Sequence, residues 1–252
     1  MKTSDIFYFG LKLQAFLLPQ YHPASYEQQV LGHEARLRNA TLEDADDIST
    51  VIIAAFGPLP DWQYIYQFRK QYPEEHRNCI RYGVGQILSD PSTHAQVIEA
   101  PADSAISLVA FAIWSQHNES RRGLNGFSHF LSSNCTHKDL NFTRGLDFNH
   151  KFTAQKKRYI DKGDFGTDQL YLAHLGTHPK YQLRGAGTRL VGRGIEVGKR
   201  DGVNVTLIAQ PTAETFYVHL GFTSVANISV KTVDDEVFRY PVMKYNFSGE
   251  AF

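Results

Sequence analysis

The sequence has few cysteines, no excess of either charge and no long hydrophobic run. Lysine and arginine together number 26, aspartate and glutamate together 26, and the formal net charge is zero. This balance provides no basic field to attract nucleic acid. No apolar stretch approaches the length of a membrane-spanning helix, and the nearest, residues 6 to 18, is interrupted by Lys12 and Gln14. We therefore expect neither a nucleic acid nor a membrane as a partner.

Only two cysteines, Cys79 and Cys135, occur in the 252 residues. Two are too few for a disulfide framework, and no histidine accompanies them at a spacing typical of metal ligands. We expect both to be reduced and structural, and we expect no metal. The first residues carry Asp5 where a secretory leader would be basic, and no small-residue cleavage site follows. A cytoplasmic location is predicted.

The composition is that of a folded domain with a sizeable core. Hydrophobic residues make up 42% of the chain and aromatic residues 13%, so neither a disulfide nor a metal is needed for folding. The hydrophobic pattern becomes regular near Glu34. We predict one domain over residues 35–245, an N-terminal extension at 1–34, a polar insertion at about 116–167 and a tail at 246–252.

Periodicity and turn residues predict an alternation of strands and helices along this domain. The insertion is expected to be irregular apart from a helical segment at 148–160, and it is placed where a lid or substrate wall would be found. Strands are expected at 35–38, 94–100, 105–115, 170–177, 203–209, 222–231 and 236–245, and helices at 41–56, within 62–88, at 184–200 and at 212–220.

A glycine turn joins the strand that ends at Thr177 to the helix that follows it. Gly185 and Gly187 allow a ligand to approach the backbone closely, and the helix start presents backbone N–H groups at the positive end of the helix dipole. Such a position favours a phosphate or pyrophosphate. A dinucleotide fingerprint would need a third glycine at Leu190, and a phosphate-binding P-loop would need Gly-Lys-Ser/Thr, so both are excluded.

Two motifs around this turn resemble those of the GNAT superfamily of N-acetyltransferases. Gln182-Leu-Arg-Gly-Ala-Gly187 follows a strand that ends Leu175-Gly-Thr-His-Pro179, and Phe216-Tyr-Val-His-Leu-Gly-Phe222 lies at the expected distance beyond it. The resemblance covers roughly residues 35 to 245. It is closest to fungal, small-molecule-type members with the pattern Thr-His-Pro-x-Tyr-Gln-x-Arg-Gly-Ala-Gly.

The resemblance implies an α/β fold with a mixed, largely antiparallel central sheet of about six to seven strands and helices on both faces. It also implies acetyl-CoA as the acyl donor. In the family, amides of the turn hold the CoA pyrophosphate while the preceding strand pairs with the pantetheine arm. The cofactor-binding residues implied in this chain are Leu175, Gly176, Thr177, Gln182, Leu183, Arg184, Gly185, Ala186, Gly187 and Thr188.

The resemblance assigns Tyr217 as the general acid that protonates the departing CoA thiolate. A tyrosine with an ordinary pKa of ~10 has a proton to give near neutrality. The general base stays open between Tyr171, His174 and a water relay. Strand alternation puts residues 171, 173, 175 and 177 on one face and His174 on the other, where a core histidine is expected.

Two positions depart from related fungal sequences, which commonly carry acids there: Ala173 and Ile208 are apolar in this chain. The resulting hypothesis is an acyl-CoA-dependent N-acyltransferase that transfers an acetyl group directly to a small-molecule amine. The alternatives are a non-catalytic acyl-CoA-binding regulatory module and a protein N-acetyltransferase. The acceptor pocket is expected from residues 57–88 and from the insertion. A monomer or a homodimer is expected.

Overall fold

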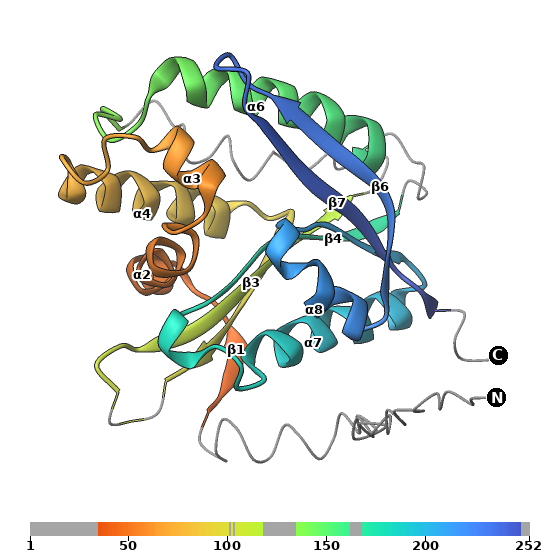
Figure 1. Ribbon diagram of the computed structural model, residues 1–252. Helices are drawn as coiled ribbons and strands as arrows, with labels where there is room; N and C mark the ends of the chain where they lie inside the picture. The colour runs from red at the N-terminus through yellow and green to blue at the C-terminus, as the bar shows by residue number, and fades with distance from the viewer. Residues whose placement is uncertain (1–34, 101, 103, 118–134, 162–167, 248–252) are drawn as a thin grey trace, which may run out of the picture.

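The computed structural model describes residues 35–100, 102, 104–117, 135–161 and 168–247 (Figure 1). The expected extension at 1–34, parts of the insertion and residues 248–252 lie outside the described residues. The strands are β1 (Leu37–Asn39), β2 (Thr93–Glu99), β3 (Leu108–His117), β4 (Gln169–Thr177), β5 (Asn204–Ile208), β6 (Phe222–Lys231) and β7 (Val237–Tyr245). The α-helices are α2 (Ala45–Phe56), α3 (Pro60–Ile65), α4 (Pro73–Ser89), α6 (Phe142–Lys156), α7 (Ala186–Asp201) and α8 (Glu214–His219).

The strands form one seven-stranded sheet in the order β1-β2-β3-β4-β5-β7-β6. Only β4 and β5 pair in parallel, and all other neighbours are antiparallel. A parallel pair needs a crossover connection, and α7 supplies it. This arrangement confirms the expected mixed, largely antiparallel sheet.

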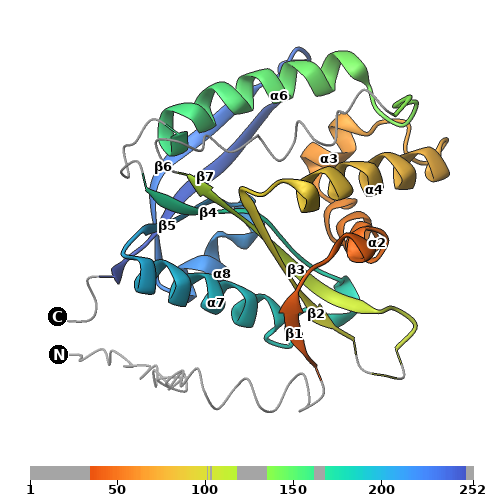
Figure 2. The ribbon, with the colours of Figure 1, turned by 180° about the vertical axis from the view of Figure 1, so that it is seen from behind.

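Helices cover both faces of the sheet, as expected (Figures 1 and 2). On one face α2, α3, α4 and α6 enclose an apolar cluster that includes Ile48, Ile80, Phe111 and Tyr171. On the other face α7 and α8 enclose a cluster that includes Trp114, Leu190 and Tyr217. No helix among the described residues combines the length and apolar character needed to cross a bilayer.

A β-bulge interrupts the pairing of β3 with β4 beside the predicted site. Ile113 lies opposite His174, whereas the next residue, Trp114, lies opposite Leu172, so Ala173 is an extra residue on β4. An extra residue reverses the alternation of side chains between the two faces. The bulge therefore changes which residues of β4 face the cavity described below.

The insertion contains a longer helix than the sequence predicts. Helix α6 starts at Phe142, because the Asn141 side chain caps it by accepting a hydrogen bond from the Arg144 backbone N–H at 3.2 Å. It packs along β6, where Gln155 donates to the Ser229 carbonyl at 2.5 Å and accepts from the Ser229 backbone N–H at 3.1 Å. The early turns were missed because Gly145 and several polar residues obscure the periodicity.

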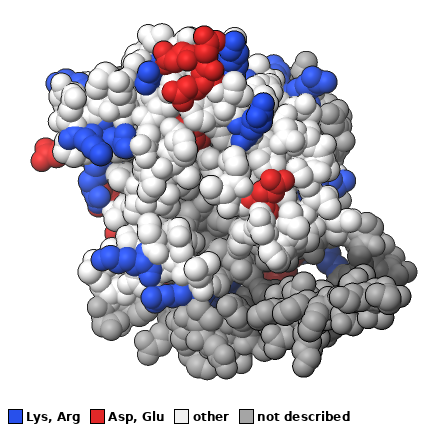
Figure 3. All heavy atoms as spheres, in the orientation of Figure 1, with Lys and Arg blue, Asp and Glu red and all other residues white. Residues whose placement is uncertain are grey.

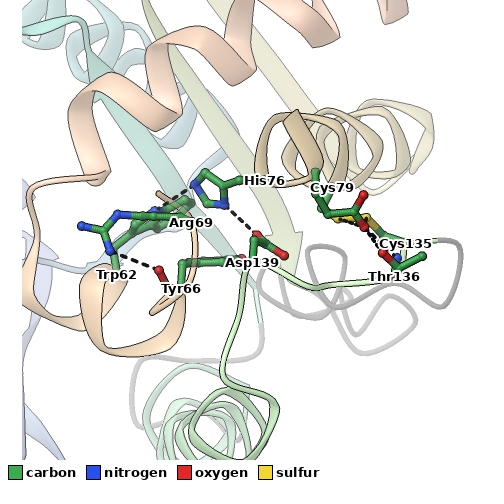
Figure 4. Close-up of polar contacts among 9 residues, drawn as sticks. Trp62, Tyr66, Arg69, His76, Cys79, Cys135, Thr136 and Asp139 are labelled. Carbon is green, nitrogen blue, oxygen red and sulfur yellow. Dashed lines mark hydrogen bonds and ion pairs between the residues drawn. A yellow bond between two sulfur atoms is a disulfide. The ribbon is translucent and has the colours of Figure 1, made fainter. Parts of the chain in front are cut away.

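The expectation that both cysteines are reduced is wrong in this structure. Cys79 of α4 and Cys135, which precedes α6, form a disulfide across a sequence separation of 56 residues (Figure 4). Two cysteines so far apart in sequence give no signal of pairing, since only the packing of α4 against the chain before α6 brings them together. The bond ties the part of the insertion that precedes α6 to helix α4.

Reduction of this disulfide is expected to lower the free energy of unfolding by about 4 kcal/mol, because opening a loop of this length restores conformational entropy to the unfolded chain. Urea unfolding with and without dithiothreitol measures the difference. The double variant Cys79→Ser, Cys135→Ser is the control and should not respond to dithiothreitol. Two titratable thiols in the denatured, unreduced protein would contradict the bond.

Candidate active site

The predicted glycine turn forms an open helix start with free backbone amides. Gly185 precedes α7 in the left-handed conformation, with φ of 82°, which glycine adopts without strain. No side chain of the described chain caps this end, and the first helical bond runs from the Arg189 amide to the Gly185 carbonyl at 2.9 Å. The amides of Ala186, Gly187 and Thr188 therefore point outward at the positive end of a 16-residue helix, where an anion is stabilised.

The residues assigned to CoA lie together around this turn. The Gln182 side chain donates to the Thr177 carbonyl at 3.2 Å, which joins the turn to the end of β4. Leu183 is 96% exposed at a φ of 59°, and the Arg184 guanidinium lies 5.3 Å from the centre of the Tyr181 ring. The turn therefore presents exposed apolar and cationic groups beside the free amides.

Packing requires glycine at position 176 and leaves little room for a side chain at Gly187. A Cβ on Gly176 would lie 2.5 Å from Cε1 of Phe111, and a Cβ on Gly187 would lie 3.2 Å from Cζ of Phe216. Substitution at either position would disturb the core as well as a ligand. Thr188, which is half-buried at the third helical position, is a cleaner position for testing anion binding.

Strands β4 and β5 part beside the turn and open a cavity. Their pairing runs only from Gln169 with Asn204 to Leu172 with Leu207, although β4 continues to Thr177. The unpaired edge of β4 offers backbone groups to an extended ligand, as the edge of a sheet does to a peptide. The cavity measures about 220 Å³. Its lining residues are Phe56, Leu59, Asp61, Trp62, Ile65, Phe148, Asn149, Phe152, Thr153, Lys156, Tyr171, Leu172, Ala173, His174, Leu175, Ile208, Ala209, Gln210, Ala213, Tyr217 and Tyr240.

His174 does not lie where simple alternation puts it. Directly opposite residues of an antiparallel pair share a face, and His174 lies opposite Ile113, which belongs to the same apolar cluster as Tyr171. The bulge at Ala173 thus turns His174 toward the cavity, which Tyr171 and Ala173 also line. Leu175 and Thr177, expected on the face of Tyr171, lie opposite Ala112 and Ala110 and so belong to the other face.

His178 shapes the turn that follows β4. Its Nδ1 accepts a hydrogen bond from the Lys180 backbone N–H at 3.3 Å. Burial and the nearby Lys180 charge lower the pKa of His178, which favours the neutral ring needed to accept this bond.

Tyr217 lies on α8 in the wall of the cavity and is 6% exposed. Its ring packs against Phe216 and Phe222, with ring centres 5.0 and 5.7 Å away. Burial raises the pKa of Tyr217 above its ordinary value because the phenolate would be poorly solvated. The phenol therefore remains protonated at neutral pH and can act as a proton donor within the cavity.

Asp61, at the start of α3, is a polar group that sequence reasoning did not single out. Its Oδ2 accepts hydrogen bonds from the Gln210 amide at 2.7 Å and the Tyr240 hydroxyl at 2.8 Å. Burial and the adjacent Asp61 charge raise the pKa of Tyr240, so that hydroxyl stays a donor. The available signal for Asp61 was a single acidic residue beside Trp62 in a proline-flanked segment. The signal is weak because the hydrogen-bond partners, Gln210 and Tyr240, come from distant parts of the sequence.

A buried network holds Trp62 in the cavity wall (Figure 4). The Trp62 indole N–H donates to Nε2 of His76 at 3.4 Å, and Nδ1 of His76 lies 2.7 Å from Oδ2 of Asp139. Because an indole can only donate, Nε2 of His76 must accept, and Nδ1 then carries the proton that bonds Asp139. This chain connects the segment before α6 to the cavity through α4.

The same region contains a cysteine and histidine cluster that the sequence analysis missed. The ligating atoms of Cys79, Cys135 and His137 lie within 4.8 Å of one another. In this structure the two sulfur atoms bond each other, so the disulfide takes up both thiols. The short spacing from Cys135 to His137 was the overlooked signal.

Comparison with known proteins places this geometry in one structural class. Residues 116–235 match the family model described as an acetyltransferase (GNAT) domain. The matched region contains the bulged strand, the glycine turn, α7 and Tyr217. A search of the curated proteins found no match.

Solved structures with the same fold support this classification. A histone acetyltransferase HPA2 and related acetyltransferase from Corynebacterium glutamicum aligns with a TM-score of 0.53 and 20% identity, covering 83% of this chain and 94% of that one. Arabidopsis thaliana NAA60 in complex with acetyl-CoA aligns with a TM-score of 0.50 and 12% identity, covering 85% and 99%. The chain therefore has the fold of GNAT acetyltransferases.

Proposed function

We propose that the protein is an acetyl-CoA-dependent N-acetyltransferase that transfers the acetyl group directly to the amine of a small molecule. The observation that carries the proposal is the arrangement of three features around one opening: the uncapped start of α7, the unpaired edge of β4 and the cavity wall that bears Tyr217. A free anion site beside an open strand edge suits a long ligand with a diphosphate at one end and an extended arm.

The chemistry follows from this placement. The amine nitrogen attacks the acetyl carbon, the carbon–sulfur bond breaks, and the nitrogen gives up a proton. Tyr217 donates its proton to the departing sulfur, and a backbone N–H of the β4 segment Leu175 to Thr177 stabilises the negative charge on the thioester oxygen. The base that takes the proton from nitrogen is Tyr171, His174 or a water, and the bulge favours His174 because it brings that ring to the cavity.

The size and apolar lining of the cavity favour a small acceptor over a protein tail. Its walls come from α2, α3, α6, α8, β4, β5 and β7, and its volume of about 220 Å³ limits the size of the acceptor. On the face seen in Figure 3, the acidic and basic side chains of described residues stand in small separate groups, with no acidic track for a basic tail. We accordingly propose a small-molecule-type acetyltransferase, as the fungal pattern indicates. We rank this function above that of a protein N-acetyltransferase or a regulatory module.

A cytoplasmic location remains part of the proposal, and the disulfide is the observation against it. Disulfides are rare in the cytosol, where they are usually transient or redox-sensing. Labelling of free thiols in intact cells before lysis distinguishes the two states of Cys79 and Cys135.

The experiment that tests the proposed function combines binding with turnover. Calorimetry is expected to show micromolar affinity for acetyl-CoA and CoA, and a panel of small amines is expected to contain acceptors that release CoA thiol. Binding without release for any amine or peptide would favour the regulatory module. Absence of acetyl-CoA binding would overturn the proposal.

A further inference from the structure

We infer that the acceptor is an arylalkylamine, a primary amine joined to an aromatic ring through a short carbon chain, and that Asp61 receives its ammonium group. The inference rests on the proposed acetyl transfer, because it assigns the second substrate of the same cavity. Three observations carry it: Asp61 has no cationic partner among the described residues, aromatic rings line the cavity, and Lys156 contacts a different part of the cavity wall from Asp61.

Asp61 is a carboxylate whose hydrogen-bond partners are all neutral. In addition to Gln210 and Tyr240, the Trp62 backbone N–H bonds its Oδ1 at 2.9 Å. No lysine or arginine among the described residues forms an ion pair with it. A carboxylate in a largely apolar cavity gains most from a cation that also donates hydrogen bonds, and a primary ammonium does both.

Asp61 is hydrogen-bonded to the segment of the chain that leads to Tyr217. Gln210, which bonds Asp61, lies two residues beyond the end of β5 and precedes the short 3-10 turn Pro211–Ala213, after which α8 carries Tyr217. Asp61, Gln210 and Tyr217 all line the cavity where β4 and β5 part. An ammonium held at Asp61 therefore lies on the acetyl-transfer side of the cavity.

The walls beyond Asp61 are built from aromatic rings. Phe152 meets Tyr240 edge to face, with ring centres 5.4 Å apart and an interplanar angle of 89°, and Phe148 lies 5.9 Å from Phe152. On the α3 side, Phe56 and Trp62 have ring centres 5.9 Å apart. Such a surface favours an aromatic ligand, because the ligand buries apolar surface and makes edge-to-face contacts with the rings.

The position of the other charged lining residue, Lys156, disfavours an α-amino acid as the acceptor. Its ammonium lies 4.7 Å from the centre of the Tyr171 ring, and Tyr171 is paired with Thr206 in the middle of β5. Gln210, which bonds Asp61, lies four residues after Thr206 and beyond the end of the β4–β5 pairing, so Asp61 and Lys156 contact different parts of the cavity wall. An α-amino acid carries its carboxylate on the same carbon as the amine, so its carboxylate would lie near Asp61 and be repelled.

The test compares 2-phenylethylamine, propylamine and L-phenylalanine as acceptors in the thiol-release assay with acetyl-CoA. We expect kcat/KM for 2-phenylethylamine to exceed that for each of the others by about 100-fold. Asp61→Asn is expected to raise KM for 2-phenylethylamine by about 10- to 100-fold, the loss for a hydrogen bond to a charged group, and to change kcat far less. A KM effect without a kcat effect separates substrate capture from a general loss of structure.

The matched control is Asp235→Asn, the same change outside the cavity. Asp235 is exposed, pairs with Lys231 at 2.8 Å and has a φ of 62°, which asparagine also adopts readily. It should leave KM unchanged. Asp61→Asn retains an oxygen that can accept from Gln210 and Tyr240, and its thermal midpoint checks that it folds.

Acetyl-CoA affinity, measured on the same samples, separates the two proposals. A preference for L-phenylalanine or a short peptide, or an unchanged KM in Asp61→Asn, would overturn the arylalkylamine assignment and leave the acetyltransferase proposal standing. If no acceptor turns over, calorimetry of 2-phenylethylamine with the protein–CoA complex decides, and no binding there overturns the assignment. Loss of acetyl-CoA binding in the unmodified protein would overturn the proposed function itself.

Discussion

Replacing Thr188 by glutamate is expected to weaken acetyl-CoA binding by about 100-fold, or roughly 3 kcal/mol, because the new carboxylate stands where the proposed diphosphate binds. Thr188 is the third residue of α7, and its amide is one of those left free at the helix start. Glutamate is well tolerated at this position of a helix, since it interacts favourably with the helix dipole. The variant should therefore fold normally and lose affinity, which calorimetry measures.

Thr188→Gln is the control for this experiment. Glutamine has nearly the same shape as glutamate without the charge, so it should keep acetyl-CoA affinity within about threefold if repulsion causes the loss. Equal losses in both variants would mean that side-chain size matters and charge does not. Full affinity in Thr188→Glu would remove the diphosphate from the start of α7.

Tyr217→Phe is expected to lower kcat by about 100-fold or more, the usual contribution of a positioned general acid, while acetyl-CoA affinity stays near its original value. The ring remains, so its packing against Phe216 and Phe222 is preserved. Only the hydroxyl, and with it the proton for the leaving sulfur, is lost. Steady-state kinetics with a saturating amine, beside calorimetry, measure the two effects.

Two further measurements sharpen the assignment of Tyr217. Because burial raises its pKa, kcat should not fall between about pH 7 and pH 9 through loss of this proton. Tyr245→Phe, which also leaves a ring packed on Phe222 at 5.3 Å but lies outside the cavity, is the matched control and should keep its kcat. An unaffected Tyr217→Phe enzyme would place the acid at another residue.

The elements around the turn could be predicted because their signals are local. Glycines at 185 and 187, the strand before them and the periodic helix after them lie within one short stretch, and α7 begins within two residues of the expected position. The aromatic pair at Phe216 and Tyr217 is similarly local. A turn or a helix start depends mainly on neighbouring backbone conformations, so residue type and spacing carry the information.

The face of His174 could not be predicted, because a bulge depends on two strands. The sequence of β4 reads as an even alternation, and only its register with Ile113 and Trp114 of β3 shows that Ala173 is the extra residue. The same holds for the disulfide, whose cysteines have no spacing signal. Pairing between distant segments is decided by which surfaces pack together.

The sequence by itself determined the order of the elements and the position of the glycine turn, because these follow from periodicity and local backbone preference, and its resemblance to the GNAT superfamily indicated the class of fold. Only the tertiary structure decided the acceptor end of the cavity. Asp61, Gln210 and Tyr240 come from helix α3, the connection after β5 and strand β7, and none carries a signal within its own segment. Their meeting depends on how α3, the connection after β5 and β7 come together around one cavity, which is a property of the whole fold.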